Sequence, residues 1–157
     1  MLTLREYRPQ DFERLLEIDT ACFVEGIAYS QEEMHYFLSR PAGIVLVGEE
    51  AGDSGSKRIL GFVIADHFRA RRSRQRMGRI ITIDVLPEAQ RRRLGSHLLI
   101  AAEGKLKDIG CGYVSLETAV DNFAALRFYK KQGYVGLRIL PRYYLDSLDA
   151  LQMGKEI

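Results

Sequence analysis

The sequence is poor in cysteine and histidine and has no tryptophan, and the scarcity of the first two excludes two classes of site. Its two cysteines, Cys22 and Cys111, are too few for a disulfide framework and form no C-x-x-C pair. The three histidines, His35, His67 and His97, show no H-E-x-x-H spacing. The sequence therefore predicts neither a disulfide scaffold nor a metal site.

Long apolar runs are also missing from the chain. No segment approaches the roughly 20 apolar residues that a membrane span requires, and Arg5 and Glu6 interrupt the N-terminus where a signal peptide would be apolar. We therefore expect a cytoplasmic protein with no membrane association. With 157 residues, 46% of them hydrophobic and 28% charged, the chain suits one folded domain over residues 1–157, as a monomer or homodimer.

Charge is nearly balanced in total but unevenly distributed. The chain has 23 Lys and Arg against 21 Asp and Glu, a formal charge of +2. The window from Arg69 to Arg93 holds nine arginines and only two acids, Asp84 and Glu88, so it carries 9 − 2 = +7 and the remainder 14 − 19 = −5. Such a basic band indicates an anionic ligand or a charged partner.

Hydrophobic periodicity predicts about seven strands and four helices. The strands are expected at residues 2–7, 44–48, 59–65, 80–85, 113–117, 134–140 and 150–153. The helices are expected at about residues 11–23, 30–38, 94–109 and 122–132. Helices that connect strands in the second half favour parallel pairing there, and short connections elsewhere favour antiparallel pairing. The fold class is mixed α/β, with a central mixed sheet flanked by helices.

The first informative motif lies between a strand and a helix, at residues 85–96. A helix N-terminus offers unpaired N–H groups and partial positive charge, so it binds phosphate well. Gly95 allows close backbone approach, and Arg91, Arg92 and Arg93 add donors suited to phosphate oxygens. By itself the pattern fits a solvated basic turn equally well.

A second motif follows at residues 116–134. With the turn, it resembles the GCN5-related N-acetyltransferase (GNAT) superfamily, which shows Gln/Arg-x-x-Gly-x-Gly/Ala and then Asn-x-x-Ala-x-x-Phe/Leu-Tyr-x-x-x-Gly-Phe/Tyr. The matching residues are Gln90, Gly95, Asn122, Ala125, Phe128, Tyr129, Gly133 and Tyr134. The resemblance implies a GNAT fold whose parallel strands splay to form an acetyl-CoA cleft. It also implies an N-acetyltransferase that uses acetyl-CoA as cosubstrate and no metal.

One residue departs from the family pattern, because Arg93 stands where the family has the first glycine of the turn. If the position needs a positive φ or clearance for the cofactor, Arg93 strains the loop or displaces the pyrophosphate. Alternatively, its side chain supplements the phosphate cradle.

The resemblance also implies which residues hold the cofactor. Pantetheine would pair with the strand that ends at Val85, whose free N–H groups are suited to stabilise an oxyanion, and the pyrophosphate would sit on the turn. The expected cofactor-binding residues are Ile83, Asp84, Val85, Gln90, Arg91, Arg92, Arg93, Leu94, Gly95, Ser96 and Asn122. Asn122 also suits an N-cap.

Two residues are candidates for proton transfer. Glu117 is the expected general base for the acceptor amine, directly or through water, and Tyr129 the expected general acid for the leaving thiolate. Each has a structural alternative: Glu117 as a salt-bridged strand-end glutamate, and Tyr129 as a buried aromatic of the core.

Within the superfamily the second half is most similar to ribosomal-protein-alanine N-acetyltransferases. The shared segments include Glu117 twelve residues before Tyr129 and the run Pro141-Arg142-Tyr143-Tyr144. That similarity implies a protein N-terminal amine as acceptor. A small-molecule amine, or a non-catalytic module that binds acyl-CoA or associates with nucleic acid, remains as an alternative.

The arginine-rich segment from Arg69 to Arg76, extended to Arg79, belongs to neither motif. Its five arginines in eight residues are expected in a loop between two strands. The simplest interpretation is a solvated, mobile loop. The functional alternatives are an acidic acceptor protein, ribosomal RNA near the acceptor, or the 3′-phosphate of CoA.

Overall fold

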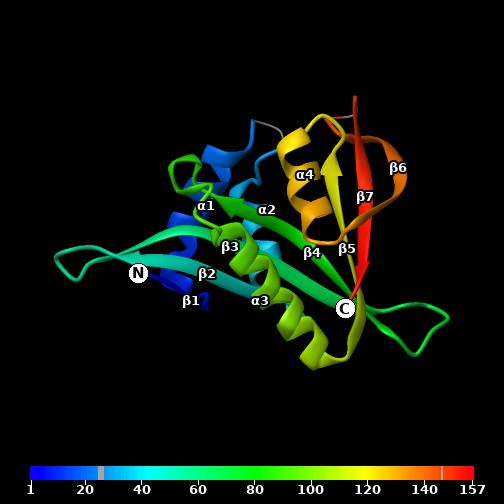
Figure 1. Ribbon diagram of the computed structural model, residues 1–157, viewed down its shortest axis with the longest axis horizontal. Coiled ribbons are helices and arrows are strands. Elements are labelled where there is room, and N and C mark those ends of the chain that lie inside the picture. The colour runs from blue at the N-terminus through cyan, green and yellow to red at the C-terminus, as the bar shows by residue number, and fades with distance from the viewer. Residues whose placement is uncertain (25–26, 146) are drawn as a thin grey trace.

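A computed structural model describes residues 1–24, 27–145 and 147–157 as one seven-stranded sheet with two layers of helices (Figure 1). The strands are β1 (Leu2–Glu6), β2 (Ile44–Ala51), β3 (Lys57–Arg69), β4 (Arg76–Val85), β5 (Cys111–Ala119), β6 (Val135–Tyr144) and β7 (Leu148–Glu156). The helices are α1 (Phe12–Cys22), α2 (Gln31–Leu38), α3 (Leu94–Ile109) and α4 (Phe123–Lys131), with short 3-10 turns at Pro9–Asp11 and Pro87–Ala89. The predicted fold class and order of elements are confirmed. Among the described residues, no helix is long and apolar enough to cross a membrane.

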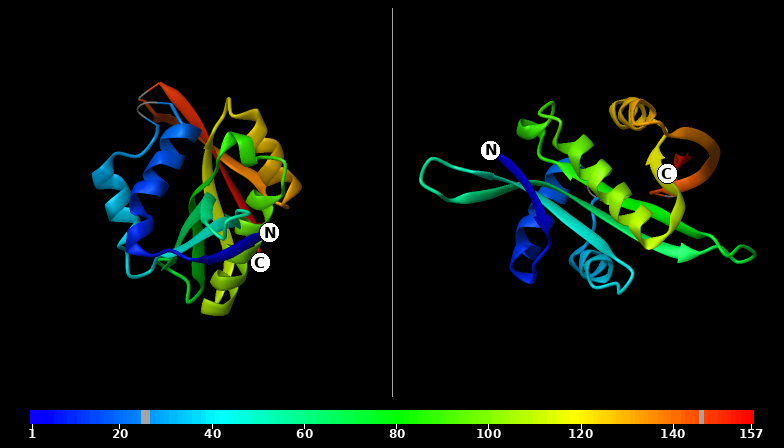
Figure 2. Two further views of the ribbon diagram at one scale, coloured as in Figure 1. Left: turned by 90° about the vertical axis from the view of Figure 1, so that its left-hand side faces the viewer. Right: turned by 60° about the horizontal axis from the view of Figure 1, so that its bottom comes forward.

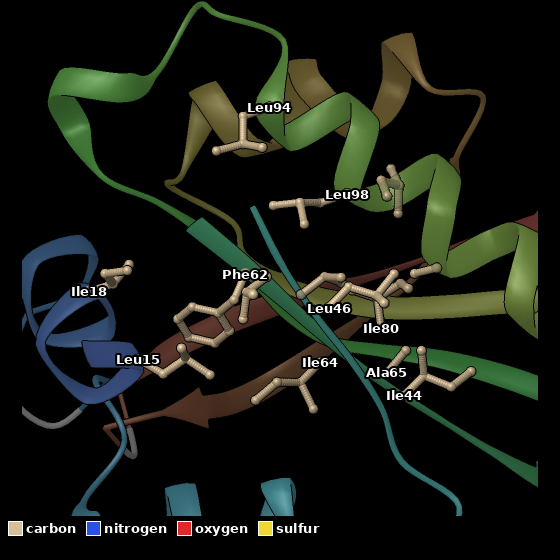
Figure 3. Close-up of a cluster of buried hydrophobic side chains, with 14 of the residues drawn as sticks. Leu15, Ile18, Ile44, Leu46, Phe62, Ile64, Ala65, Ile80, Leu94 and Leu98 are labelled. Carbon is tan, nitrogen blue, oxygen red and sulfur yellow. The ribbon is translucent and has the colours of Figure 1, made fainter. Parts of the chain in front are cut away.

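The helices cover both faces of the sheet. Helices α1 and α2 lie on one face and α3 and α4 on the other (Figure 2). Helix α3 buries an apolar stripe completely against the sheet, formed by Leu98, Leu99, Ala102 and Leu106. From the opposite face, α1 contributes Leu15 and Ile18 to the core (Figure 3). Removal of this apolar surface from water stabilises the layers at about 25 cal/mol per Å².

The sheet order is β1-β2-β3-β4-β5-β7-β6, and its only parallel pair among the described residues is β4 with β5. This pair flanks α3, as a right-handed crossover requires. Strand β7 lies between β5 and β6 and is antiparallel to both, so the helix between β5 and β6 does not join neighbouring strands. The expected parallel pairing in the second half is therefore confined to one pair.

Strands β4 and β5 separate part-way along their length. Their pairing runs from Arg76 to Arg79 on β4 and does not continue to Val85 (Figure 1). Close to the separation, the register between β3 and β4 shifts: Ile64 pairs with Thr82 but the next residue pairs with Ile80. Such a bulge bends and twists its strand, which favours divergence from the neighbour on the other side.

The predicted arginine loop is shorter than the sequence indicated. Arg69 ends β3, Arg76 begins β4, and these two residues pair across the ladder, so only residues 70–75 form the connection. Arg79 lies well inside β4. The prediction of a loop over Arg69–Arg79 was wrong, because hairpin hydrogen bonding extends the strands into a stretch whose composition is polar.

Candidate active site

Among the described residues, the separation leaves one edge of β4 without a partner strand beyond Arg79. The N–H of Leu86 donates to the Leu60 carbonyl on β3, at 2.9 Å. Because backbone groups alternate along a strand, the N–H groups of Ile83 and Val85 point the opposite way, toward β5. Since β5 has already diverged, this edge can accept an extended ligand by strand addition, as predicted for pantetheine at Ile83, Asp84 and Val85.

The turn after β4 leads into the N-terminus of α3. Gln90 fastens this turn to the strand end, because its Nε2 donates to the Val85 carbonyl at 3.2 Å. The following residues lead into α3, whose first intrahelical hydrogen bond runs from the N–H of His97 to the Arg93 carbonyl at 3.0 Å. The preceding N–H groups of an α-helix have no intrahelical acceptor. The first turn of α3 therefore offers donors at Leu94, Gly95 and Ser96, beside the open edge.

Arg93 has a left-handed backbone conformation, which glycine adopts most readily. Its φ of 62° and ψ of 11° lie in the left-handed region, and Arg91 has a φ of 69°. A non-glycine residue there costs of order 1 kcal/mol. The first alternative for Arg93 rested on a positive φ, and the position has one. Its side chain is exposed, so the second alternative also stays open.

The side chains around this turn differ in their contacts. Arg92 forms an ion pair with Glu50 on β2, with Nη1 at 3.3 Å from Oε2, so its guanidinium is directed to that strand. Ser96 accepts a hydrogen bond from Gln132 at 3.0 Å, which ties α3 to the end of α4. A Cβ on Gly95 would lie 3.5 Å from the Phe128 ring, an ordinary contact. The start of α3 is therefore held beside α4, and the position next to Gly95 leaves room for a Cβ atom.

Asn122 caps α4, as predicted: its Oδ1 accepts from the N–H of Ala125 at 3.2 Å. Two turns later, Tyr129 packs edge-on against Phe128 and Tyr134, with ring centroids 5.2 and 5.9 Å apart. Burial raises the pKa of Tyr129, and the charge of Asp84 raises it further. The phenol therefore stays protonated throughout the neutral range and is available as a donor.

Glu117 lies on β5, inside the divergence. Its side chain is 11% exposed, and its Oε2 accepts from Arg79 Nε at 3.3 Å. Its other oxygen, Oε1, lies 3.5 Å from Gln152 Nε2. The structural alternative, a salt-bridged strand-end glutamate, is therefore present.

Arg79 links this carboxylate to a tyrosine, and sequence reasoning missed the contact. Its Nη2 donates to the Tyr143 hydroxyl at 3.2 Å. Burial by itself would lower the pKa of Arg79, but the charge and hydrogen bond of Glu117, with the charges of Tyr143 and Asp66, together outweigh burial and raise it. Tyr144 packs edge-on against Tyr143, and its hydroxyl lies 3.5 Å from the Glu117 carbonyl. The sequence pattern assigned Arg79 to the arginine-rich segment, and no local spacing indicates a contact with a residue 38 positions away.

A pair of buried carboxylates was also missed. Asp84 Oδ1 accepts from the Thr82 hydroxyl at 2.5 Å, and Asp19 Oδ2 accepts from the N–H of Tyr29 at 2.6 Å. Burial, and then the hydrogen bond and charge of Asp19, raise the pKa of Asp84 well above its usual range. The pKa of Asp19 is also raised, chiefly by burial, so the pair keeps a proton to higher pH than an isolated aspartate does. From the sequence, Asp84 was predicted only to contact pantetheine as part of the strand, and no role was assigned to its carboxyl group.

Cys22, the last residue of α1, is half-buried and lies near this pair and the end of β4. Its thiol lies 3.3 Å from the Val85 carbonyl, in donor geometry. Burial, with the charges of Asp84 and Asp19, raises the pKa of this thiol to about 12. The sulfur is thus a thiol near neutral pH, and nucleophilic chemistry through a cysteine thiolate is not supported at this site.

Comparisons with known proteins agree with this geometry. The family model described as "Acetyltransferase (GNAT) family" matches residues 12–134. An N-alpha-acetyltransferase of Saccharolobus solfataricus is 25% identical, over 99% of this chain and 93% of its own length. The crystal structure of Ard1 from Thermoplasma volcanium is 29% identical, with a TM-score of 0.84 over 99% of this chain and 97% of that one.

The predicted subgroup is represented among the similar structures. The ribosomal-protein-S18-alanine N-acetyltransferase of Escherichia coli has a TM-score of 0.82 at 21% identity, covering 100% of this chain and 94% of that one. At this identity the likeness shows the shared fold alone.

Proposed function

Since this chain belongs to the acetyltransferase (GNAT) family and is an acetyl-CoA-dependent N-acetyltransferase, we propose that its acceptor is the α-amino group at a protein N-terminus. The observation that carries the proposal is the divergence of β4 from β5. It leaves an open strand edge on β4 that leads to the first turn of α3, and it supports the proposal that Glu117 on β5 and Tyr129 on α4 act there. We also propose that residues 1–157 act as one catalytic domain, because the site draws on both halves of a single sheet.

In the proposed complex, the pantetheine arm of acetyl-CoA pairs with the free N–H groups of Ile83 and Val85. The pyrophosphate lies on the first turn of α3, where N–H groups and the helix dipole favour an anion. The N–H of Val85 also suits the oxyanion that develops on the thioester carbonyl. Asn122 contributes by fixing the start of α4 and hence the position of Tyr129.

The proposed reaction is direct transfer. Glu117 takes a proton from the acceptor ammonium, a modest task because an α-amino group has a pKa near 8. The neutral nitrogen attacks the thioester carbon, the C–N bond forms and the C–S bond breaks. Tyr129 donates its phenolic proton to the departing thiolate. The nitrogen, which is cationic after the attack, returns its second proton to the Tyr129 phenolate through water, and Glu117 releases its proton to solvent. The raised pKa of Tyr129 keeps it protonated until the thiolate departs.

The surroundings of Glu117 support a peptide acceptor. Tyr143 and Tyr144 come from the end of β6 and lie near Glu117, and Tyr29, from the segment between α1 and α2, lies near Tyr144 and Arg79. Burial and the charges of Asp84 and Asp19 raise the pKa of Tyr29, so its hydroxyl stays neutral. Neutral aromatic walls with hydroxyl groups suit an extended peptide backbone.

A thiol-release assay tests the proposal. The protein is incubated with acetyl-CoA and a matched panel: short peptides with free N-termini, the same peptides with blocked N-termini and a free lysine, and small amines such as spermidine. We expect thiol release with free N-termini, at least tenfold faster than with the other two groups. Equal or faster release with small amines would replace this acceptor by a small molecule, and release only with internal lysine would refute an α-amino acceptor.

A further inference from the structure

The hairpin between β3 and β4 projects from the body of the molecule (Figures 1 and 2). Its last paired residues are Arg69 and Arg76, and the connection of residues 70–75 is an ordered turn. The N–H of Ser73 donates to the Ala70 carbonyl at 3.2 Å, and the Ser73 hydroxyl accepts from the N–H of Gln75 at 3.0 Å. We refer to residues 67–76 as the arginine hairpin.

The arginine hairpin holds five arginines and no acidic residue. These are Arg69, Arg71, Arg72, Arg74 and Arg76. Within the described parts of the chain, none of the five forms an ion pair, whereas Arg5, Arg40 and Arg79 each contact a carboxylate within 3.3 Å. Arg76 instead contacts His67 Nδ1 at 3.3 Å. The positive charge of this hairpin is therefore not neutralised by the protein's own carboxylates.

The pairing within the hairpin adds a second observation. Arg69 and Arg76 lie directly opposite each other on neighbouring strands. Like charges at such positions destabilise a sheet by up to about 1 kcal/mol. A polyanion bound across the two strands would relieve this repulsion.

An exposed aromatic side chain points to the kind of polyanion. Phe68 keeps 47% of its surface exposed, and because it pairs with Met77 it lies on the face of the hairpin opposite to the paired Arg69 and Arg76. Arginines suit phosphate oxygens through their forked donors, and an exposed aromatic ring offers a surface on which a base can stack. A flexible strand that passes around the hairpin can contact arginines on one face and stack a base on Phe68 on the other, whereas a chain of acidic side chains has no base to stack there. The combination favours a nucleic acid.

The location excludes the alternative of the CoA 3′-phosphate. The turn that receives the cofactor's phosphates follows Val85, at the far end of β4 from Arg76. Ten residues of strand place the two ends about 30 Å apart. We propose that the arginine hairpin is a docking arm for a nucleic-acid strand, separate from the acetyl-transfer site.

Fluorescence anisotropy with labelled 12-nucleotide strands tests this proposal on the full chain. The probes are single-stranded RNA, single-stranded DNA of the same sequence and the RNA duplex, with polyglutamate of equal charge as the acidic-peptide competitor. Contact with five phosphates predicts a slope of about −3.5 in log K against log salt, which is about a 100-fold loss between 50 and 200 mM. Comparison of the three nucleic acids identifies which one the hairpin prefers.

Variants locate the binding. Arg71→Gln/Arg72→Gln/Arg74→Gln changes only the connection, and we expect at least tenfold weaker binding with a flatter salt slope. The control Arg8→Gln/Lys107→Gln/Lys131→Gln removes three exposed charges outside the hairpin and should change binding less than threefold. Phe68→Leu should weaken RNA binding about fivefold and leave polyglutamate competition unchanged.

Three outcomes would overturn the proposal: no saturable binding to any nucleic acid, equal loss in the hairpin and control variants, or polyglutamate binding as tightly as RNA. Acetyl transfer to a short peptide should be unchanged in the hairpin variant, because its three residues lie outside the cleft. The acetyl-transfer assay therefore distinguishes a failure of the nucleic-acid proposal from a failure of the proposed N-terminal acceptor.

Discussion

Glu103 on α3 and Glu117 on β5 have similar partners but different surroundings. Both are about one-tenth exposed and ion-paired, Glu103 with Lys155 and Glu117 with Arg79. Glu103 accepts from the Tyr134 hydroxyl at 2.8 Å and from Lys155 Nζ at 3.1 Å. The contacts of Glu117 are longer, 3.3 Å to Arg79 and 3.5 Å to Gln152.

The difference follows from the location of each glutamate. Glu103 joins α3 to β7 in a closed interface where Tyr134 is 1% exposed, so its donors are already close. Glu117 lies on β5 beyond Ser115, the last residue that pairs with β4, so no strand pairing closes this part of the sheet. Short, complete hydrogen bonding is typical of a structural role, whereas the contacts of catalytic groups are often long in the free protein and tighten when a substrate binds.

The largest expected effect separates these roles. Glu117→Gln should lower kcat/KM for an N-terminal peptide about 100-fold and change the acidic limb of the pH–rate profile, because general base catalysis contributes about 10²–10⁴. Its melting temperature should move little. Glu103→Gln should do the reverse, with an activity within twofold at low temperature and a loss of stability of about 1–3 kcal/mol.

Steady-state kinetics and thermal unfolding of both variants provide the check. An acidic limb that is identical in Glu117→Gln and the wild type would remove Glu117 as the base. A stability loss in Glu117→Gln as large as in Glu103→Gln would show that the two ion pairs have the same structural role.

The tyrosines allow the next comparison. Tyr129→Phe should retain acetyl-CoA binding and stability but lower turnover at least tenfold, because the proton donor for the thiolate is lost. Tyr134→Phe should leave turnover intact and cost about 1–2 kcal/mol, because Glu103 loses a buried donor. Wild-type turnover in Tyr129→Phe would favour its alternative as a core aromatic only.

Two glycines extend the comparison to the cofactor. Gly95→Ala should weaken acetyl-CoA binding about fivefold without loss of stability, because the new Cβ meets only ordinary contacts in the free protein. Gly61→Ala is the packing control: its Cβ would lie 2.7 Å from the Asp84 carbonyl oxygen, so it should unfold at lower temperature. Calorimetric titration of acetyl-CoA measures the first effect. Unchanged affinity in Gly95→Ala would argue against backbone approach at this turn.

The smallest expected effect concerns the buried pair Asp19 and Asp84. A carboxyl whose pKa is raised by folding favours the native state below its unfolded pKa, near 3.9, and loses that contribution as pH rises through the native pKa. Asp84→Asn should therefore melt about 3 °C higher than the wild type at pH 7.5, and the difference should vanish near pH 3.5. Melting temperatures of the variant and the wild type, measured from pH 3.5 to 7.5, test this prediction. A variant that melts at a lower temperature than the wild type at pH 7.5 would contradict a shared proton.

Local patterns predicted much of the fold and part of the site. The helices at about residues 30–38 and 94–109 and the N-cap at Asn122 depend on neighbours in sequence, and all are present. The positions of the phosphate-binding turn and of Glu117 followed from motif spacing, but their roles remain predictions. The contact of Arg79 with Glu117 joins residues 38 apart, and no periodicity reports such a contact.

The sequence by itself determined the fold class, the order of elements and membership of the acetyltransferase family, because short-range spacing of apolar, capping and glycine residues carries that information. Tertiary structure alone decided where β4 leaves β5, that Glu117 pairs with Arg79, and that Asp19 meets Asp84. It also decided which arginines find carboxylates and which are left on a projecting hairpin. Those outcomes depend on strand register, a bulge and burial, which arise only when distant segments pack together.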